Sequence, residues 1–163
     1  CSVCVLDGVD VVYVCRAAVS RIVSANVTIG SRLPAYCTAM GRAMLSRLTD
    51  DEIRERLEQS SLDKLTPLTV TSKRKLMELV SAVRREGYSL LDQELDLGLR
   101  ALAVPLAIPS AMVVAAVGLS VQSHRVSAAA LKAHLPVLLQ GASQIRDGVV
   151  ESQRNKALRS IPA

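Results

Sequence analysis

Residues 30–48, GSRLPAYCTAMGRAMLSRL, decide how the rest of the chain is arranged, because they turn from a loop into a helix through unusually small residues. Thr38 is an acceptable helix N-cap. The backbone N–H groups of Ala39, Met40 and Gly41 would then be the unpaired donors of the first turn, at the positive end of the helix dipole. A turn of this kind can bind a carboxylate or a phosphate without a charged side chain.

A second interpretation begins the helix at Pro34, since proline is favoured at the first helical position. Cys37, Met40, Met44 and Leu48 then fall at helical spacing, which is typical of a helix with one buried face. In that case the segment contributes only to the hydrophobic core. Periodicity alone favours this second interpretation, and both stay open.

The chain has the size of one ordinary domain, since its 163 residues can bury a real core but are few for two domains. Half of the residues are hydrophobic, yet there is no Phe or Trp and there are only three Tyr. The core must therefore be packed with Leu, Val, Ile, Ala and Met. Any cavity in it is expected to be aliphatic, with adaptable Met side chains in its walls.

The charge balance of 20 basic against 15 acidic residues gives a net charge of +5, which invites a nucleic-acid interpretation. The basic residues are scattered, however. The densest groups are 73–75 and 84–85, which are typical of a solvated helix face, and no aromatic stacking residues accompany them. We therefore expect this segment not to bind DNA or RNA directly.

Four cysteines include a C-x-x-C pair at Cys1 and Cys4. The flanking residues predict a strand, in which residues three apart point to opposite faces and cannot share a metal ion. No second pair at zinc-site spacing follows, and His124 and His134 are far away in the sequence, so we expect no metal site. Reduced, buried thiols indicate a cytoplasmic protein. The missing initiator Met and leader indicate a fragment whose N-terminal part was removed.

Residues 101–123 contain no charge and are long enough to span a bilayer. Pro105 and Pro109 would interrupt such a helix, and the pair Pro109–Ser110 indicates a turn between two runs rich in Val and Ala. Two buried strands joined as a hairpin are therefore predicted here, and no membrane contact.

The remaining elements are predicted from alternation, helical periodicity and capping residues. The strands expected are 2–6 and 11–15, which form a hairpin around Asp7–Gly8, then 21–27, 88–91, 99–106 and 112–121. The helices expected are 51–59, 72–86 with Gly87 at its end, and 127–151 with a kink or restart at Pro136; residues 60–70 form a connector.

Catalytic chemistry needs a nucleophile with a base, a pair of carboxylates or a metal cluster, and none is evident. Asp92, Glu94 and Asp96 lie in a turn between strands and are expected to be solvated. The two histidines have no acidic partner nearby. Cys37 lies near a helix start, which can lower a thiol pKa, but without a histidine partner a small buried residue is the simpler role. These residues predict a binding module rather than a catalytic centre.

Two blocks of sequence carry a resemblance to a known family. Residues 30–45, GSRLPAYCTAMGRAML, and residues 84–105, RREGYSLLDQELDLGLRALAVP, resemble two diagnostic blocks of the effector-binding domain of IclR-type bacterial transcriptional regulators, in the same order and with the same separation. The resemblance covers nearly the whole chain. The amino-acid sequence of both blocks is most similar to that of the branch that regulates aromatic-acid breakdown through the β-ketoadipate pathway.

The resemblance implies an α+β fold related to GAF and profilin-like domains, with a curved antiparallel sheet of about six strands and helices on its faces. It implies that residues 1–151 form the effector-binding domain, that residues 152–163 are a polar and loose C-terminal tail, and that a winged helix-turn-helix domain precedes them. DNA would be bound only through that missing domain. A cytoplasmic homodimer or homotetramer, with no cofactor, is implied as well.

The family binds small organic acids between the sheet and the loop-to-helix turn, and its functional positions transfer one by one. The backbone donors fall at Ala39 and Met40, within a first turn that runs from Thr38 to Gly41. The wall positions fall at Leu91, Leu99 and Ala101, and the hydroxyl-bearing strand positions fall at Gly118 and Ser120.

Two departures from the family pattern matter. Members that bind very small keto acids have an acid in place of Leu91 and a serine in place of Gly118. Losing both polar groups predicts a less polar and roomier pocket, as a larger aromatic or dicarboxylic effector would need. The second departure is an apolar turn at residues 108–112, which is either an oligomer contact or a short buried turn.

Two functional hypotheses follow from the sequence. The first is a ligand sensor that modulates an attached DNA-binding domain. The alternative is a small-molecule hydrolase or isomerase built on a similar sheet. Recovery of the ligand unchanged would distinguish the sensor from the enzyme.

Overall fold

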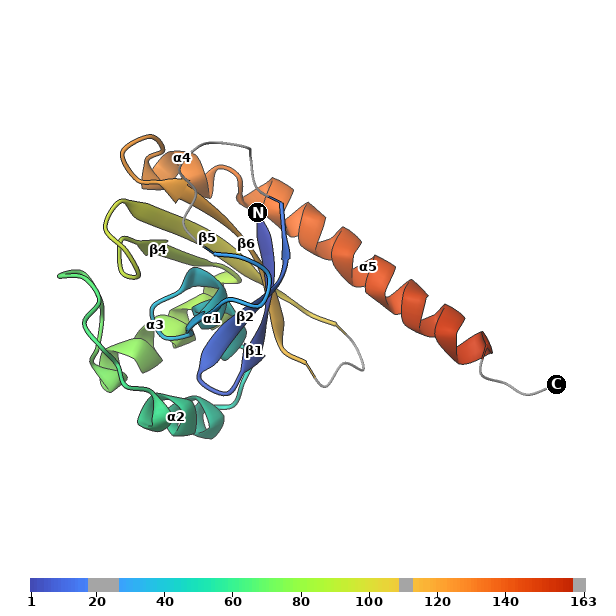
Figure 1. The fold of residues 1–163 in the computed structure, drawn as a ribbon, viewed down its shortest axis with the longest axis horizontal. Helices are drawn as coiled ribbons and strands as arrows, with labels where there is room; N and C mark the ends of the chain where they lie inside the picture. Colours follow the sequence, from blue (N-terminus) through green and yellow to red (C-terminus); the bar gives the residue numbers. More distant parts are fainter. Residues whose placement is uncertain (18–26, 109–112, 160–163) are drawn as a thin grey trace.

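The computed structural model describes residues 1–17, 27–108 and 113–159, and an antiparallel sheet forms its centre. The sheet has six strands in the order β3-β2-β1-β6-β5-β4, so the first strand of the chain, β1, pairs with the last strand, β6. Helices cover both faces, as Figure 1 shows. The strands are β1 (Ser2–Asp7), β2 (Asp10–Arg16), β3 (Arg32–Pro34), β4 (Ser89–Asp92), β5 (Leu99–Leu106) and β6 (Ala115–Gln122). The helices are α1 (Ala39–Leu45), α2 (Asp50–Gln59), α3 (Lys73–Glu86), α4 (Ala128–Lys132) and α5 (Leu135–Arg159). The α+β fold expected from the resemblance is confirmed.

The N-terminal hairpin of β1 and β2 is confirmed, and Gly8 at its tip has a φ of +61°, which glycine adopts without strain. Cys1 is exposed and Cys4 is buried, as expected for residues three apart in a strand. The predicted strand at 21–27 lies almost entirely outside the described residues. The strand that the structure describes next to β2 at this edge of the sheet is β3, which lies within the stretch expected to be a loop.

The helix start at Thr38 is confirmed, and the interpretation that begins the helix at Pro34 is wrong. Pro34 is the last residue of β3 and is paired with Asp10 of β2. The hydroxyl of Thr38 donates to the carbonyl oxygen of Pro34 at 3.1 Å and accepts from the N–H of Gly41 at 3.1 Å. Because β2 holds Pro34 in extended backbone, the chain turns into the helix only four residues later.

The next two helices begin within one residue of the predicted positions. Thr49 and Glu52 form a capping box at α2, which starts at Asp50, one residue earlier than expected. The two hydrogen bonds from Thr49 lower the pKa of the Glu52 carboxyl. Ser72 caps α3, and Gly87 ends it with a φ of +79°. The basic residues of α3 are exposed, as expected for a solvated helix face.

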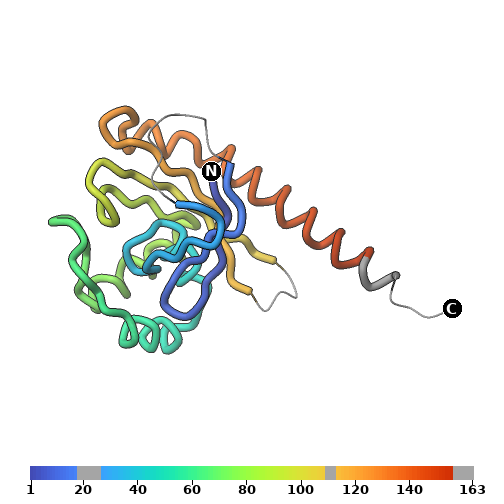
Figure 2. Tube along the Cα trace, viewed as in Figure 1, coloured from blue at the N-terminus to red at the C-terminus, as the bar shows by residue number. Residues whose placement is uncertain are grey.

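The C-terminal region breaks at Pro136 as predicted, because α4 ends at Lys132 and α5 restarts at Leu135. The expected helix end near Glu151 is wrong: α5 continues to Arg159, so most of the region expected to be a loose tail is helical. Figures 1 and 2 show that α5 projects well beyond the sheet. Of the apolar turn at 108–112, only Ile108 is described, and it packs partly against the core.

The sheet separates two hydrophobic cores. One lies beneath α1, α2 and α3 and contains Tyr36, Met44, Ile53 and Leu76. The other lies beneath α4 and α5 and contains Leu102, Val104, Leu131 and Leu138. None of the described helices is both long and apolar enough to cross a membrane.

Candidate ligand-binding pocket

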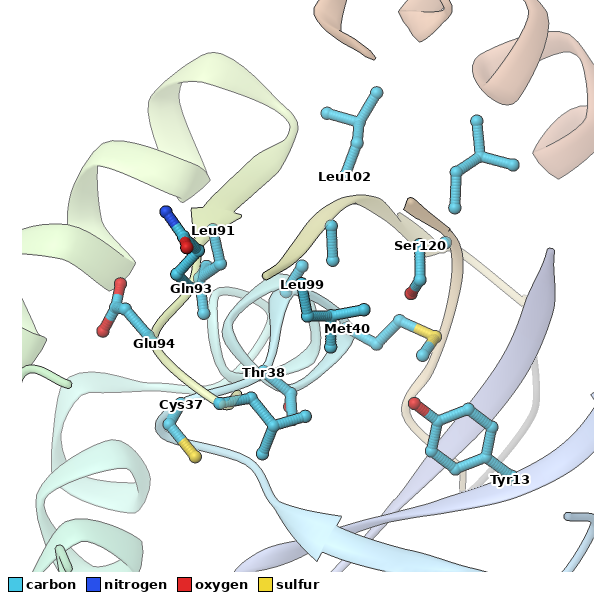
Figure 3. A pocket seen from close by; sticks show the side chains of 15 residues that line it. Tyr13, Cys37, Thr38, Met40, Leu91, Gln93, Glu94, Leu99, Leu102 and Ser120 are labelled. Carbon is cyan, nitrogen blue, oxygen red and sulfur yellow. The ribbon is translucent and has the colours of Figure 1, made fainter. Parts of the chain in front are cut away.

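The sheet and the first turn of α1 enclose a cleft that we call the α1 pocket. It contains about 410 Å³ of space free of atoms, part of it open to solvent. Figure 3 shows the side chains of the 15 residues that line it, which come from α1, β2, the connection between β4 and β5, and the middle of the sheet. Eight of the nine residues singled out from the sequence lie here: Thr38, Ala39, Met40, Leu91, Leu99, Ala101, Gly118 and Ser120.

Gly41, the ninth, does not line the pocket. Its N–H is already bound to the Thr38 hydroxyl. A Cβ atom at this position would lie 2.1 Å from the carbonyl oxygen of Ala35 and 2.4 Å from its Cα. Gly41 is therefore a packing residue, which lets the first turn of α1 lie directly against the loop that precedes it.

The first turn does retain two donors toward the pocket. Across the described residues, the backbone N–H groups of Ala39 and Met40 have no hydrogen-bond partner, whereas that of Gly41 is capped. The two residues are 3% and 5% exposed, and both line the pocket. N–H groups of this kind readily donate hydrogen bonds to the oxygen atoms of an anion.

Several lining residues were not singled out from the sequence. Tyr13 reaches the pocket from β2, and Gln93, Glu94 and Leu95 reach it from the connection between β4 and β5. Burial raises the pKa of the Tyr13 hydroxyl to about 12, so the group stays neutral and can donate a hydrogen bond. Tyr13 lies 25 positions before Thr38, and only the strand order brings the two together.

Cys37 also lines the pocket, immediately before the helix N-cap. Burial raises the pKa of its thiol to about 11, and the thiol points to the Pro34 carbonyl oxygen at 3.8 Å. The role as a small buried residue is confirmed, and a thiolate nucleophile is not supported.

The expectation that Asp92, Glu94 and Asp96 are all solvated is wrong for Glu94. Glu94 accepts from both terminal nitrogens of Arg42, at 2.8 and 2.5 Å. The side chains of Arg42 and Glu94 are only 3% and 12% exposed. Asp92 accepts from Arg100 at 2.7 Å, but its side chain is 41% exposed. Asp96 is exposed.

The expected free space at Gly118 is also absent. A Cβ added to Gly118 would meet the Cγ of Met40 at 2.9 Å. The side chain of Met40 thus fills the volume that a side chain at position 118 would occupy. The pocket therefore gains no open depth from the glycine, contrary to the roomier pocket predicted from Leu91 and Gly118.

The chemistry of the pocket suits a small, mainly apolar molecule with few polar groups. Its walls are aliphatic, while the hydroxyls of Tyr13 and Ser120 and the amide of Gln93 provide isolated hydrogen-bonding groups. The carboxylate of Glu94 is neutralised by Arg42. Within residues 1–17, 27–108 and 113–159, no group of three or more His, Cys, Asp or Glu side chains could hold a metal ion.

A small-molecule pocket between a curved antiparallel sheet and a loop-to-helix turn defines a ligand-binding domain. The chain belongs to the family described as "Bacterial transcriptional regulator IclR C-terminal", whose profile matches residues 1–147. The resemblance stated from the two sequence blocks is thereby confirmed.

Individual relatives agree with this family. The chain is 38% identical over 142 residues to the Pca regulon regulatory protein of Pseudomonas putida, which covers 86% of this chain and 49% of the relative. A transcriptional regulator from Rhodococcus sp. RHA1 superposes with a TM-score of 0.85 and 44% identity, over 91% of this chain and 60% of the other.

A third similar protein is the inducer-binding domain of the PobR transcription factor from Acinetobacter, solved as a double mutant in complex with 3-hydroxybenzoic acid. It superposes with a TM-score of 0.81 and 35% identity, over 89% of this chain and 86% of that domain. The chain spans about half the length of the curated relatives it matches.

Proposed function

We propose that this chain is the ligand-sensing domain of a transcriptional regulator. It binds a small aromatic or dicarboxylic acid in the α1 pocket and thereby modulates DNA binding by an attached winged helix-turn-helix domain. The observation that carries the proposal is the pocket itself, whose walls are aliphatic and whose α1 side presents the uncapped N–H groups of Ala39 and Met40. A carboxylate at that turn would leave the apolar part of the acid against Leu91, Leu99 and Ala101.

Two relatives support this class of ligand. The related PobR domain holds 3-hydroxybenzoic acid, and the relative from Pseudomonas putida regulates the Pca regulon by its name. The regulator is proposed to act in the cytoplasm as a homodimer or homotetramer, in which a bound acid favours one arrangement of the attached domains over another.

The proposal is tested by thermal denaturation in the presence of benzoate, 4-hydroxybenzoate, 3,4-dihydroxybenzoate, muconate or β-ketoadipate. An acid that binds only the folded chain raises the melting temperature in a concentration-dependent way. Chromatography of the acid afterwards should recover it unchanged, as a sensor requires and a hydrolase or isomerase does not. Glyoxylate and pyruvate are included in the same measurement for comparison, as examples of very small acids.

Substitution of Ala101 by Leu should abolish the stabilisation while the domain still folds, since Ala101 is only partly buried in the pocket wall. Ala129→Leu, on the exposed side of α4, is the control and should leave the stabilisation intact. Stabilisation by glyoxylate or pyruvate and by none of the larger acids would contradict the proposed ligand class. Retained binding in Ala101→Leu would place the site elsewhere.

A further inference from the structure

Met40 lies directly over a glycine in the middle of the sheet. Gly118 belongs to β6, where it pairs with Ala103 of β5 and Ser2 of β1. Its φ lies outside the positive region, so its backbone does not require a glycine. The lack of space around position 118 does require a glycine. An added Cβ would lie 2.9 Å from the Cγ of Met40, 3.1 Å from the carbonyl oxygen of Leu102 and 3.2 Å from the Cβ of Ala103.

The sheet around Gly118 is lined with small residues on the face that meets α1. The register places Ala103 opposite Gly118 and Ala101 opposite Ser120. Figure 3 shows the Met40 side chain extending across this floor, between Leu99 and the hydroxyl of Tyr13, with Ser120 beside it. Over such a floor, the position of one large side chain decides how much of the pocket is empty.

Met40 is suited to move without a change of the backbone. Methionine is unbranched and has three rotatable bonds, so its thioether end can adopt another rotamer at small cost. The remaining atoms around Gly118 cannot move so easily, because Leu102 contributes a backbone oxygen of the central sheet and Ala103 has no rotatable side chain.

We propose that Met40 and Gly118 together set the size of the acid that the α1 pocket accepts. In the empty pocket the Met40 side chain packs on Gly118, where the absence of a Cβ leaves room for the thioether. When an aromatic ring enters, the Met40 side chain changes rotamer and moves away. This inference rests on the proposed function, because it concerns the site in which the acid binds. The side chain of Met40 then selects acids by size, whereas the backbone N–H of the same residue only binds the carboxylate that all of these acids share.

The test uses isothermal titration calorimetry with two probes that differ by one fused ring, benzoate and 2-naphthoate. Met40→Ala should raise the affinity for 2-naphthoate relative to benzoate by about tenfold, the size of a typical apolar-pocket discrimination. Gly118→Ala should lower the affinity for both acids by about tenfold, because the added methyl group displaces Met40 into the pocket. In the double variant Met40→Ala/Gly118→Ala, most of the lost affinity should return.

Met44→Ala is the matched control. Met44 lies one turn further along α1 and is fully buried, but it does not line the pocket. Its removal should lower the stability of the fold, followed by urea denaturation, and leave the ratio of the two affinities unchanged. Should Met40→Ala not fold, Met40→Leu keeps the volume with a stiffer, branched side chain and should weaken benzoate binding severalfold.

Three results would overturn the inference while leaving the proposed function intact, provided that the unsubstituted chain binds benzoate. These are an unchanged affinity ratio in Met40→Ala, unchanged benzoate binding in Met40→Leu, and strictly additive effects in the double variant. A chain that binds none of the acids of the thermal panel and neither of these probes contradicts the proposed function itself.

Discussion

At the scale of single residues, Gly41 shows how a position in a predicted site can act through packing alone. A Cβ there would lie 2.1 Å from the Ala35 carbonyl oxygen and 2.5 Å from the Thr38 Oγ1. The first contact is with backbone atoms, which no side-chain rotation can relieve. Gly41 thus allows the loop and the first turn of α1 to approach each other, and this approach positions Thr38 as the cap.

Replacing Gly41 by Ala is therefore expected to lower the free energy of unfolding by at least about 3 kcal/mol, by overpacking against fixed backbone. Gly141→Ala is the control: it lies in α5 with no atom within 4 Å of the added Cβ. That variant should gain up to about 1 kcal/mol from the better helix propensity of alanine. Urea denaturation measures both, and equal effects of the two substitutions would refute the packing role of Gly41.

At the scale of elements, a buried ion pair ties α1 to the connection between β4 and β5. Arg42 donates to both carboxylate oxygens of Glu94, and its Nε donates to the Tyr36 carbonyl oxygen at 2.8 Å. Glu94 also accepts from the N–H of Val70 at 3.1 Å. The pocket wall that contains Glu94 is therefore held against the helix by charge-assisted hydrogen bonds from Arg42.

Arg42→Met and Glu94→Gln are each expected to lower the free energy of unfolding by about 3–5 kcal/mol, because each leaves a buried partner unpaired. Both should also weaken acid binding, since the wall at Glu94 loses its anchor. Chemical denaturation of the two single variants and the double variant gives the coupling between them.

The exposed pair of Arg54 and Asp51 provides the comparison for this experiment. Their side chains are 59% and 93% exposed, so Arg54→Met should change stability by less than about 1 kcal/mol. If Arg42→Met were equally mild, the ion pair would not be what holds α1 to the β4–β5 connection.

At the scale of the whole molecule, α5 has two parts with different roles. Leu138 and Ala142 near its start pack into the second core, whereas residues 151–155 are all exposed. Figure 1 shows the later turns extending away from the sheet. Among the side chains that the structure describes, those in the first part of the helix therefore contribute most to the stability of the domain.

A chain that ends after Glu151 is thus expected to unfold with a free energy within about 1 kcal/mol of the full chain, because the described side chains that it loses, residues 152–155, are exposed. Leu138→Ala, which opens a cavity at a residue 5% exposed, should cost about 2–5 kcal/mol. Denaturant titration compares them. A large loss on truncation would mean that the projecting turns are covered, and light scattering would then reveal whether another copy of the chain covers them.

Local sequence was sufficient for the elements whose signals lie within a few residues. The cap Thr38 and the glycine at the end of α3 were predicted from residues that contact each other across one helical turn. The strands β5 and β6 were predicted nearly in full, because their signal, two runs rich in Val and Ala, also lies within a few residues. Thr38, Ala39 and Met40 were predicted from the helix cap. The five strand residues of the pocket came from the resemblance to a family, since no local rule connects Leu91 with Ser120.

The features that local patterns missed depend on residues distant in the sequence. Glu94 looks like part of an acidic turn, but Arg42, 52 positions earlier, makes it a buried partner. Gly118 looks like free space, but Met40 occupies that space from another element. Tyr13 reaches the pocket only because β2 lies near α1 in the folded sheet. Periodicity and capping therefore established which segments form helices and strands, whereas packing between those segments decided which charges are neutralised and which volume stays open.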